Sequence, residues 1–559
     1  MRHPLLAAIG VAFAITLPAA SAAQTPSALT GLVSSADEAA MEGVLVSATK
    51  AGSTITTTVV TGADGRFNFP TDRLTPGKYN LAVRAIGYQL DAPKTVEIKP
   101  GELPGQKAAT QDIKLAKATD LAAQLSNGEW LASIPGTDAQ KAQLLNCVGC
   151  HRVERIMRSK YDTDGFLTGI LPRMQGYVQQ SLPIHPQLRP AERLMEEQGE
   201  DRIEIYRSVA QYLSSINLSA TEKWNYPLVT YPRPTGRATR VIYTEYDLPR
   251  EEIAPHDAIV GKDGAVWFSS FGEQKLGRLD PKTGNVTEFP YDMHRPDGPT
   301  GSLGLRSDAA GNLWLGNMYQ ATIVKFDPST EKFAFWTLPP EANIPAAQIN
   351  MVSPQHSDVD GKVWTQNNGF AGVHRLDIAT GKIETWEPFK GAPKGQSHNI
   401  YDVVPDSHNN AFFTDFRQGQ IGRIDAKTGE VALFQTPTPR SSPRRGNMDP
   451  QDRLWFGEYR ADRIGMLDTR TYAFKEWKLR TRWSAPYDVV LDRNENAWTG
   501  SMVTDLVTRL DTRTGEMVDY LMPRPTNIRR VFVDNSTTPV SFWVGSNDGA
   551  SIVKIEPLD

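Results

Sequence analysis

The feature that most constrains the fold is a short tag that recurs six times in the C-terminal part of the chain. Its acidic residue lies at Asp280, Asp327, Asp377, Asp425, Asp468 and Asp511, at spacings of 47, 50, 48, 43 and 43 residues. Short strands that begin with an aromatic residue accompany the tags: VWFSSF, LWLGNM, VWTQNN, AFFTDF, LWFGEY, AWTGSM and a last FWVGSN. Seven units of about four short strands, at this period, are typical of a β-propeller.

The two ends of the array are complementary. The last unit stops at SIVKIEPLD without an outer strand, whereas RVIYTEYDLPR, residues 240–250, has an outer-strand pattern but precedes the first unit. We therefore predict that residues 240–248 complete the last blade and close the ring, which removes exposed edge strands. A solenoid or two separate sandwiches is the alternative.

The repeats, as in PHDAIVGKDGAVWFSSFGEQKLGRLDPKTGNVTEFP, resemble the virginiamycin B (streptogramin) lyase family. The resemblance covers residues 236–559 and implies a seven-bladed propeller. It also implies a lyase that opens a lactone with a histidine base and a Mg²⁺ ion held by glutamates. Among the strand-end positions of this chain only Asp415 and Glu458 are carboxylates, so the glutamate pair of the family has no direct counterpart.

Polar residues nevertheless gather where one mouth of the ring is expected. His398, Glu458 and His256 are candidate catalytic residues; both histidines are expected to begin the strands that line the channel, and Glu458 is a carboxylate at a strand end. A ligand pocket for an anionic or sugar-like molecule is predicted from Asn317, Asn367, Asp415, Arg417, Arg444 and Arg460. The alternative for each histidine is a structural residue whose hydrogen bonds are satisfied within a turn or strand end.

Residues 25–118 alternate apolar and polar side chains between turn signals, which predicts a small antiparallel β-sandwich. Asp64-Gly65 suits a tight hairpin, and Phe67 and Tyr79 are placed to fill the sandwich. The segment resembles the carboxypeptidase regulatory-like domain family through Thr30-Gly31, Gly43-Val44, Asp64-Gly65-Arg66-Phe67, Gly77-Lys78-Tyr79 and Gly87-Tyr88. That resemblance implies a docking or spacer module without peptidase activity.

Residues 119–218 have a helical pattern. Thr137 with Gln140 forms a capping box at the start of a helix that leads into the cysteines, and residues 202–216 form a second helix with one apolar stripe.

Both cysteines of the chain lie between these helices, in the pentapeptide Cys147-Val148-Gly149-Cys150-His151. The pattern C-x-x-C-H is the attachment signature of haem c, in which both thiols bond the porphyrin and the histidine binds iron. A Cys147–Cys150 disulfide or a zinc site is the alternative. A disulfide needs no adjacent histidine, however, and zinc requires more ligands.

The helical region resembles class I cytochrome c domains, on the pentapeptide and the 202–216 helix. The resemblance implies a distal methionine as the second ligand of the haem iron. We favour Met174 for this position, with His185 second, because Met157 is too near His151 in the chain and Met195 lies in a charged stretch. A methionine ligand raises the reduction potential.

Residues 1–23 have the basic start, apolar run and small-residue cleavage pattern of an export signal. We therefore expect a periplasmic or secreted protein with no transmembrane anchor after cleavage. The balance of 60 basic and 64 acidic residues argues against nucleic acid as a partner.

Three functions remain in view. The first is a c-type cytochrome that transfers electrons to a redox partner protein, or oxidises a small molecule bound at the propeller. The second is a carbon–oxygen lyase, with Mg²⁺ as its cofactor. The third is a non-catalytic binding scaffold.

Overall fold

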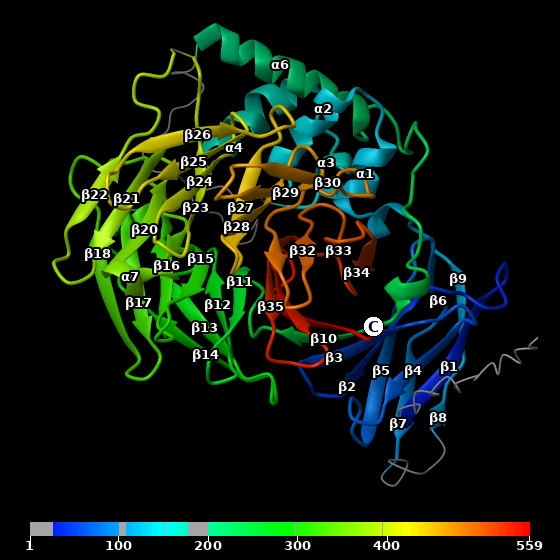
Figure 1. Ribbon diagram of the computed structural model, residues 1–559. Coiled ribbons are helices and arrows are strands. Elements are labelled where there is room, and N and C mark those ends of the chain that lie inside the picture. Colours follow the sequence, from blue (N-terminus) through cyan, green and yellow to red (C-terminus); the bar gives the residue numbers. More distant parts are fainter. Residues whose placement is uncertain (1–25, 100–107, 150, 177–198, 297, 394) are drawn as a thin grey trace, which may run out of the picture.

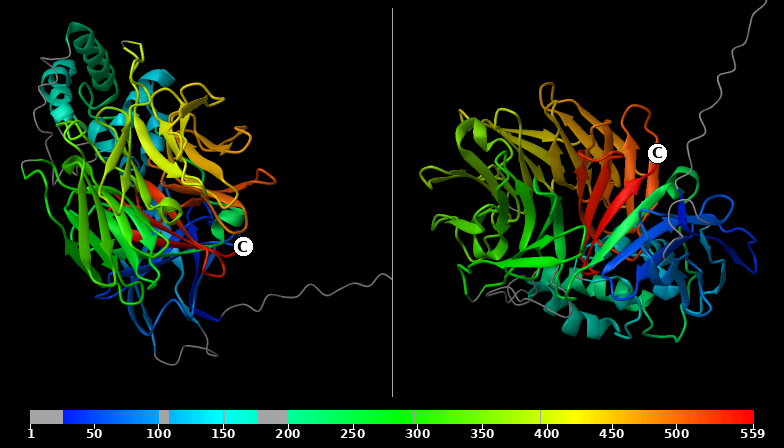
Figure 2. Two further views of the ribbon diagram at one scale, coloured as in Figure 1. Left: turned by 60° about the vertical axis from the view of Figure 1, so that its left-hand side comes forward. Right: turned by 90° about the horizontal axis from the view of Figure 1, so that it is seen from below.

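The computed structural model describes residues 26–99, 108–149, 151–176, 199–296, 298–393 and 395–559. Within these ranges the protein is mainly β. A sandwich-like N-terminal domain lies at the edge of a ring of four-stranded sheets, and a small helical segment lies across one face of that ring (Figures 1 and 2). The predicted export signal, residues 1–23, lies outside the described residues.

The N-terminal domain packs two sheets face to face. Its strands are β1 (Ser27–Ser35), β2 (Leu45–Lys50), β3 (Ile55–Val60), β4 (Arg66–Pro70), β5 (Gly77–Arg84), β6 (Tyr88–Leu90), β7 (Lys94–Ile98), β8 (Ala109–Thr110) and β9 (Ile113–Lys117). One sheet has the order β4-β1-β9-β6 with β8 beside β1, and the other contains β3-β2-β5-β7. Phe67 and Tyr79 are buried in one core between them, which confirms the predicted sandwich.

The prediction for Asp64-Gly65 was wrong in one respect. The turn joins β3 to β4, and these strands belong to different sheets, so it is an arch between sheets and not a hairpin. Asp64 Oδ1 accepts a hydrogen bond from the Arg66 amide at 3.0 Å, and Gly65 has a φ of 72°. A strong turn signal fixes the reversal of the chain but not the partner of the next strand.

Seven groups of four strands form the ring. Their strands, blade by blade, are β11 (Pro255–Val260), β12 (Val266–Ser270), β13 (Lys275–Leu279), β14 (Val286–Pro290); β15 (Ser302–Ser307), β16 (Leu313–Asn317), β17 (Thr322–Asp327), β18 (Lys332–Thr337); β19 (Val352–Ser353), β20 (Lys362–Asn367), β21 (Gly372–Asp377), β22 (Ile383–Trp386); β23 (Ile400–Pro405), β24 (Ala411–Asp415), β25 (Gln420–Ile424), β26 (Val431–Gln435); β27 (Pro443–Met448), β28 (Arg453–Glu458), β29 (Arg463–Asp468), β30 (Phe474–Lys478); β31 (Val490–Leu491), β32 (Asn496–Gly500), β33 (Leu506–Asp511), β34 (Met517–Leu521); and β35 (Ile528–Asp534), β36 (Ser541–Ser546), β37 (Ser551–Pro557), β10 (Val241–Asp247). The first strands of successive groups contact one another, and β35 contacts β11, so the ring is closed.

Strand β10 closes the last blade, as the sequence predicted. It pairs antiparallel with β37, and Tyr243 stands opposite Ile555. The other edge of β10 pairs with β3 of the N-terminal domain, where Tyr243 stands opposite Thr58. The last blade and half of the sandwich therefore form one continuous eight-stranded sheet.

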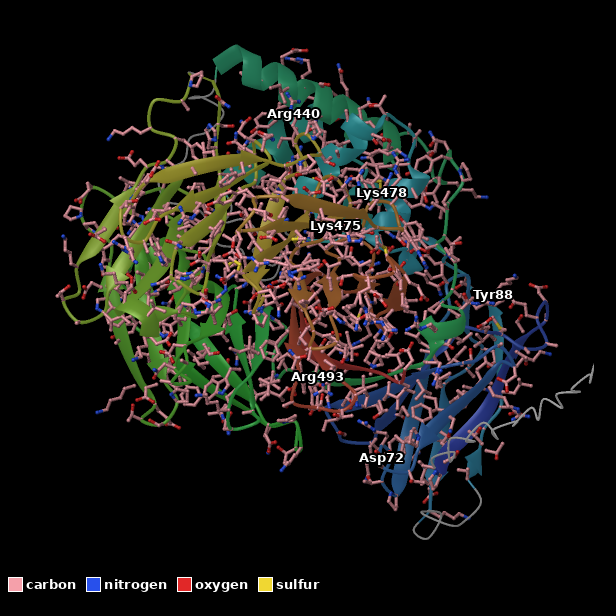
Figure 3. The ribbon with its side chains drawn as sticks, viewed as in Figure 1. Asp72, Tyr88, Arg440, Lys475, Lys478 and Arg493 are labelled. Carbon is pink, nitrogen blue, oxygen red and sulfur yellow. The ribbon has the colours of Figure 1, made fainter. Side chains whose placement is uncertain are left out.

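The repeated tags are the outer hairpins of the blades. In the first, Asp280 Oδ1 accepts a hydrogen bond from the Lys282 amide at 2.9 Å, and Asp280 Oδ2 accepts one from Thr283 Oγ1 at 2.8 Å. The fourth strand of the fifth blade, β30, presents Lys475 and Lys478 to solvent (Figure 3). The tags are thus structural.

The helical segment consists of short helices and one long one. They are η1 (Ala122–Gln124), α1 (Asn127–Ser133), α2 (Asp138–Gln143), η2 (Leu144–Asn146), α3 (Glu154–Met157), η3 (Gly165–Ile170), α4 (Leu171–Gly176) and α6 (Gly199–Ile216). The Thr137 capping box and the second predicted helix are confirmed. Three further short helices lie elsewhere: η4 (Gly236–Thr239), η5 (Met318–Gln320) and α7 (Ser357–Asp360). In the described ranges, no helix has the length and apolar character needed to cross a bilayer.

Candidate functional site

The helical segment closes one mouth of the ring. Leu145 and Val148 belong to the same buried apolar cluster as Tyr401, Tyr459 and Met502 of the blades. Polar contacts fix the chain there: Tyr459 donates a hydrogen bond to the Leu145 carbonyl at 3.2 Å, and Asn527 Nδ2 donates one to the Val148 carbonyl at 2.8 Å. The segment that carries the cysteine motif is therefore built onto the propeller and shares its core.

A chain of buried hydrogen bonds runs below this cover. His256 Nδ1 lies 2.8 Å from Asp257 Oδ1, and His256 Nε2 lies 3.0 Å from the Tyr487 hydroxyl, which lies 2.5 Å from the Tyr401 hydroxyl. Arg444 Nη2 donates to the Tyr401 hydroxyl at 3.1 Å. With His256 neutral and Asp257 ionised, each group in this series of hydrogen bonds has a consistent role as donor or acceptor.

The pKa values of this pair support that assignment. Burial lowers the pKa of His256 to about 3, so the imidazole is neutral at pH 7. Burial opposes the ionisation of Asp257, but the guanidinium groups of Arg445 and Arg530 outweigh it and hold its pKa well below the ordinary value. His256, a predicted catalytic residue, is fully buried, with both ring nitrogens engaged.

Arg444 lies in an aromatic cage at the covered mouth. Its guanidinium carbon is 4.3 Å from the ring centre of Tyr487, 4.5 Å from that of Tyr459, 4.7 Å from that of Tyr401 and 5.5 Å from that of Phe416. Such rings attract a cation through their π faces. Arg444, one of the predicted pocket residues, is 3% exposed in this cage.

His398 and Asp415 form a dyad at the start of the fourth blade. His398 Nδ1 lies 2.6 Å from Asp415 Oδ2, while Asp415 Oδ1 accepts hydrogen bonds from the amides of Asn399 and Arg417. Nδ1 therefore carries the proton, and His398 Nε2 has no hydrogen-bond partner among the described residues. A carboxylate that fixes the histidine tautomer in this way makes the second nitrogen the basic one. That nitrogen is buried, and the imidazole stacks on Phe389 with ring centres 3.8 Å apart.

Glu458 is buried in its blade with no hydrogen-bond partner for either carboxylate oxygen in the described part of the chain. Burial raises its pKa to about 8, and nearby Glu476 adds to the effect. The carboxyl group is thus largely protonated at pH 7. Across the described ranges, no hydrogen bond or ion pair joins Glu458 to His398 or His256.

The remaining predicted pocket residues differ in setting. Asn367 is buried, and its amide bonds the backbone of Gln348, Gly369 and Ala342, which is a structural role. Asn317 is buried with its Oδ1 unpartnered in the described residues. Arg417 and Arg460 are exposed.

The described part of the cysteine motif lies against the mouth. Cys147 is 8% exposed, and Met174 is half-buried against the same cluster. His151 Nδ1 donates to the Arg152 carbonyl at 2.9 Å, which leaves the lone pair on Nε2 for a metal; burial lowers the pKa of this histidine. Cys150, His185 and Met195 lie outside the described residues.

The sequence contained a signal for this mouth that residue chemistry alone missed. Five of the seven aromatic strands are followed by an aromatic residue or a methionine, and all five side chains pack into or against the shared cluster: Phe271, Met318, Phe416, Tyr459 and Met502. These apolar side chains recur at the same position of successive repeats. The recurrence indicated an apolar surface at one mouth of the ring, which the helical segment covers.

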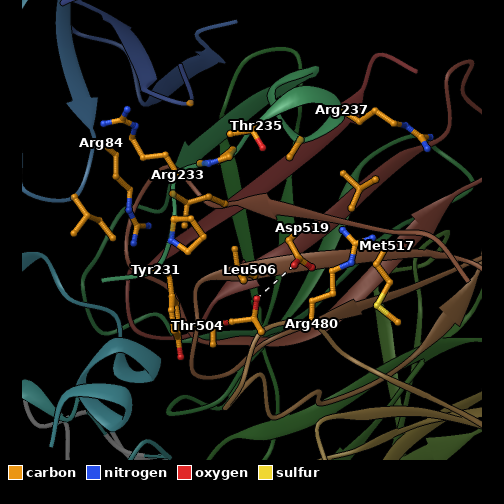
Figure 4. A pocket seen from close by; sticks show the side chains of 18 of the residues that line it. Arg84, Tyr231, Arg233, Thr235, Arg237, Arg480, Thr504, Leu506, Met517 and Asp519 are labelled. Carbon is orange, nitrogen blue, oxygen red and sulfur yellow. Dashed lines mark hydrogen bonds between the residues drawn. The ribbon is translucent and has the colours of Figure 1, made fainter. Parts of the chain in front are cut away.

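A cavity of about 370 Å³ lies elsewhere, where the sandwich, residues 231–238 and the sixth blade meet (Figure 4). None of the predicted site residues lines it. Three of the four arginines that line it have carboxylate partners: Arg84 with Asp505, Arg233 with Glu38, and Arg237 with Asp559. We therefore regard the cavity as a domain junction.

A magnesium site does not fit the predicted residues. Asp415 is engaged by His398 and two amides, and Glu458 is largely protonated at pH 7. Where side chains are described, no group of three or more His, Cys, Asp or Glu residues could hold a metal ion.

Comparison with solved structures found similar chains of low sequence identity. A selenomethionine-substituted virginiamycin B lyase from Staphylococcus aureus is 20% identical, with 56% of this chain and 99% of that chain covered and a TM-score of 0.47. A streptogramin B lyase is 21% identical, with coverages of 58% and 99% and a TM-score of 0.48. The extracellular domain of a putative one-component system from B. thetaiotaomicron is 16% identical, with coverages of 54% and 40% and a TM-score of 0.42.

Comparison with curated proteins found no match. Two family models match separate parts of the chain and leave residues 117–389 unassigned. Residues 28–116 match the carboxypeptidase regulatory-like domain, and residues 390–558, which contain His398, Asp415 and Arg444, match the virginiamycin B lyase family.

Proposed function

We propose that the ring binds a small organic molecule near its covered mouth and that His398 acts on it as a general base, in a lyase-type elimination. The observation that carries this proposal is the His398–Asp415 pair, with a distance of 2.6 Å and an unpartnered Nε2 among the described residues. The match of residues 390–558 to the virginiamycin B lyase family supports the same class of reaction.

In such a step, His398 Nε2 accepts a proton from a carbon of the substrate. The electron pair of that C–H bond forms a carbon–carbon double bond, and the neighbouring C–O bond breaks with its electrons on oxygen. Asp415 holds the imidazole in the required tautomer and stabilises the imidazolium that forms. No step is assigned to Mg²⁺, because the carboxylates present do not fit that ion.

The test is a ring-opening assay on cyclic esters, with and without chelator. We expect His398→Ala to lower kcat/KM at least about 100-fold, the usual contribution of a general base. Asp415→Asn should lower it as well, whereas the exposed His408→Ala should have no effect. Ring opening that is unchanged in His398→Ala would refute the assignment of the base.

The cysteine motif carries a second candidate function, covalent binding of haem c. The residues described there fit it: Cys147 lies in the buried cluster, and the His151 tautomer leaves Nε2 available to iron. Cys147 and Cys150 would hold the porphyrin, and the haem would supply one-electron transfer to a redox partner protein. His151 orients its ring through the Arg152 carbonyl, and Met174 is the proposed distal ligand.

This proposal is tested by expressing the full chain, with its export signal, in a host competent for cytochrome maturation. Haem staining of a denaturing gel should follow the protein band, and Cys147→Ser should abolish the stain. His151→Ala should retain covalent pigment with an altered spectrum. A colourless protein would leave the lyase, or a periplasmic or secreted binding scaffold, as the remaining function.

A further inference from the structure

Two buried arginines beneath the cysteine motif have no acidic partner. Arg444 is 3% exposed and Arg529 is 0% exposed, and among the described residues neither forms an ion pair. Both lie against one ring, that of Tyr487, with guanidinium carbons 4.3 Å and 5.7 Å from its centre. A buried guanidinium normally has a carboxylate or phosphate partner, because its desolvation is costly.

On the same two strands, β27 and β35, the next residue is also a buried arginine, and this second arginine does have a carboxylate partner. Arg445 lies 2.6 Å from Asp257 Oδ1, and Arg530 lies 2.8 Å from Asp257 Oδ2. A third buried arginine, Arg306, lies 2.7 Å from Asp402 Oδ2. These three guanidinium groups contact two aspartates, and the buried Arg375 and Arg509 contact Glu384 and Asp559. By contrast, Arg444 and Arg529 contact no carboxylate among the described residues.

The contacts that the two arginines do make are with neutral groups. Arg444 donates to the Tyr401 hydroxyl and to Met502 Sδ, and its Nε has no partner in the described chain. Arg529 donates to Asn527 Oδ1 at 2.8 Å and to the Gly149 carbonyl at 3.3 Å, and its Nη1 has none there.

One buried acid, Asp548, interacts electrostatically with Arg529, but no ion-pair contact joins the two in the described residues. Its Oδ1 has no hydrogen-bond partner there. Next to it, both side-chain polar atoms of Asn547 are buried without a partner there. Donors in excess of acceptors, around two cations, define a site for an anion.

We propose that Arg444 and Arg529 bind a carboxylate group at the mouth of the ring, beneath residues 145–149. Guanidinium groups bind carboxylates with directed N–H donors, and the rings of Tyr401, Tyr459 and Tyr487 supply apolar walls for the body of an organic acid. The carboxylate belongs either to haem or to a separate aromatic or aliphatic acid. The first source rests on the haem function proposed above, and the second does not.

The test uses the full chain, prepared both without haem and after haem attachment. The melting temperature is measured at increasing concentrations of sodium benzoate or sodium succinate, and sodium chloride of equal ionic strength is the control. Samples are equilibrated for a long time, because residues 145–149 cover the site. In the haem-free protein we expect carboxylate-specific stabilisation to heat. Arg444→Gln and Arg529→Gln should each raise the apparent Kd at least tenfold, and Arg513→Gln, on an exposed outer hairpin, should leave it unchanged.

The haem-loaded protein distinguishes the sources. If added acids no longer stabilise it, and Arg529→Gln lowers the haem reduction potential, the haem carboxylates occupy the site. If added acids still bind, the ligand is a separate acid.

Arg529→Lys keeps the charge and should retain binding if the Gln variants fold poorly. Absence of a carboxylate effect in wild-type haem-free protein, or its survival in both Gln variants, overturns the proposal; a colourless protein overturns only the haem function.

Discussion

Arg73 of the N-terminal sandwich and Glu556 of the last propeller strand form a two-pronged ion pair, with Nη1 2.7 Å from Oε2 and Nη2 3.1 Å from Oε1. Between them runs β10, which is hydrogen-bonded to both domains. Arg73 is partly exposed, so the pair itself contributes modestly to stability. The shared sheet is the more extensive connection, and we therefore expect the two domains to unfold as one cooperative unit.

The first prediction concerns that unit. Tyr243→Ala removes a large side chain, 1% exposed, from the core beside β10. Truncation of a buried aromatic residue costs about 3 to 5 kcal/mol. We expect calorimetry to show a single unfolding transition at lower temperature, because Tyr243 lies on the strand that the sandwich and the last blade share.

The matched control is Leu433→Ala on an outer strand, where the side chain is 43% exposed and the cost should be small. A separate early transition that leaves the propeller intact would contradict the cooperative unit.

The second prediction concerns acid stability. The pKa of His256 is lowered to about 3 in the folded protein and returns to about 6.5 on unfolding. Between these values the unfolded chain binds the additional proton, so this contribution to stability is full above pH 6.5 and is lost as the pH falls toward 3. His256→Gln removes the titration, and its free energy of unfolding should therefore fall less between pH 6.5 and pH 4.

Urea unfolding at a series of pH values measures this difference. The exposed His408→Gln should follow the wild-type curve. Equal slopes for wild type and His256→Gln would show that His256 is not the group that titrates.

Much of the fold was predictable, because each sequence repeat corresponds to one four-stranded blade that packs against its neighbours. The tags and aromatic strands placed all seven blades, and the unmatched ends placed residues 240–248 on the last one. The second pairing of β10, with β3, was not predictable, because no repeat marked the other edge of β10 as lacking a partner. The prediction for the Asp64-Gly65 turn was wrong because a turn signal does not fix the partner of the next strand.

The candidate site was predicted less well, since chemistry at a propeller mouth depends on which side chains meet across the ring. His256 had the residue type of a base, but Asp257 and Tyr487 engage both of its nitrogens. Tyr487 and Arg529 were not predicted at all. Adjacent arginines, as at 444–445 and 529–530, look alike in sequence, and only the fold shows that one of each pair has an aspartate.

The third prediction concerns alkaline stability. Burial raises the pKa of Glu458 from 4.5 to about 8, so the folded protein holds a proton that the unfolded chain releases above pH 4.5. The contribution of this group therefore favours folding at low pH and is lost as the pH rises toward 8, at about 1.4 kcal/mol per pKa unit at most. In Glu458→Gln the free energy of unfolding should fall less between pH 5 and pH 9. The variant should therefore gain stability relative to wild type as the pH rises from 5 to 9.

Glu430→Gln, at an exposed position, provides the control for Glu458. Should Glu458→Gln lose stability equally at pH 5 and pH 9, the carboxyl group would be ionised in the folded protein, and its raised pKa would be disproved.

The last prediction concerns the distal ligand of the proposed haem. Met174 and Met502 both lie in or against the buried cluster that contains Cys147, so either sulfur is a reasonable neighbour of a porphyrin attached there. Met502 Sδ already accepts a hydrogen bond from Arg444 Nη1 at 3.2 Å, whereas no such contact is described for Met174. In haem-loaded protein, Met174→Ala should abolish the thioether-to-iron band near the red end of the oxidised spectrum and lower the reduction potential, because a thioether stabilises ferrous iron. Met502→Leu should keep the band. The reverse result would transfer the ligand from the helical segment to the propeller, and the ring would then complete the coordination of the iron as well as cover it.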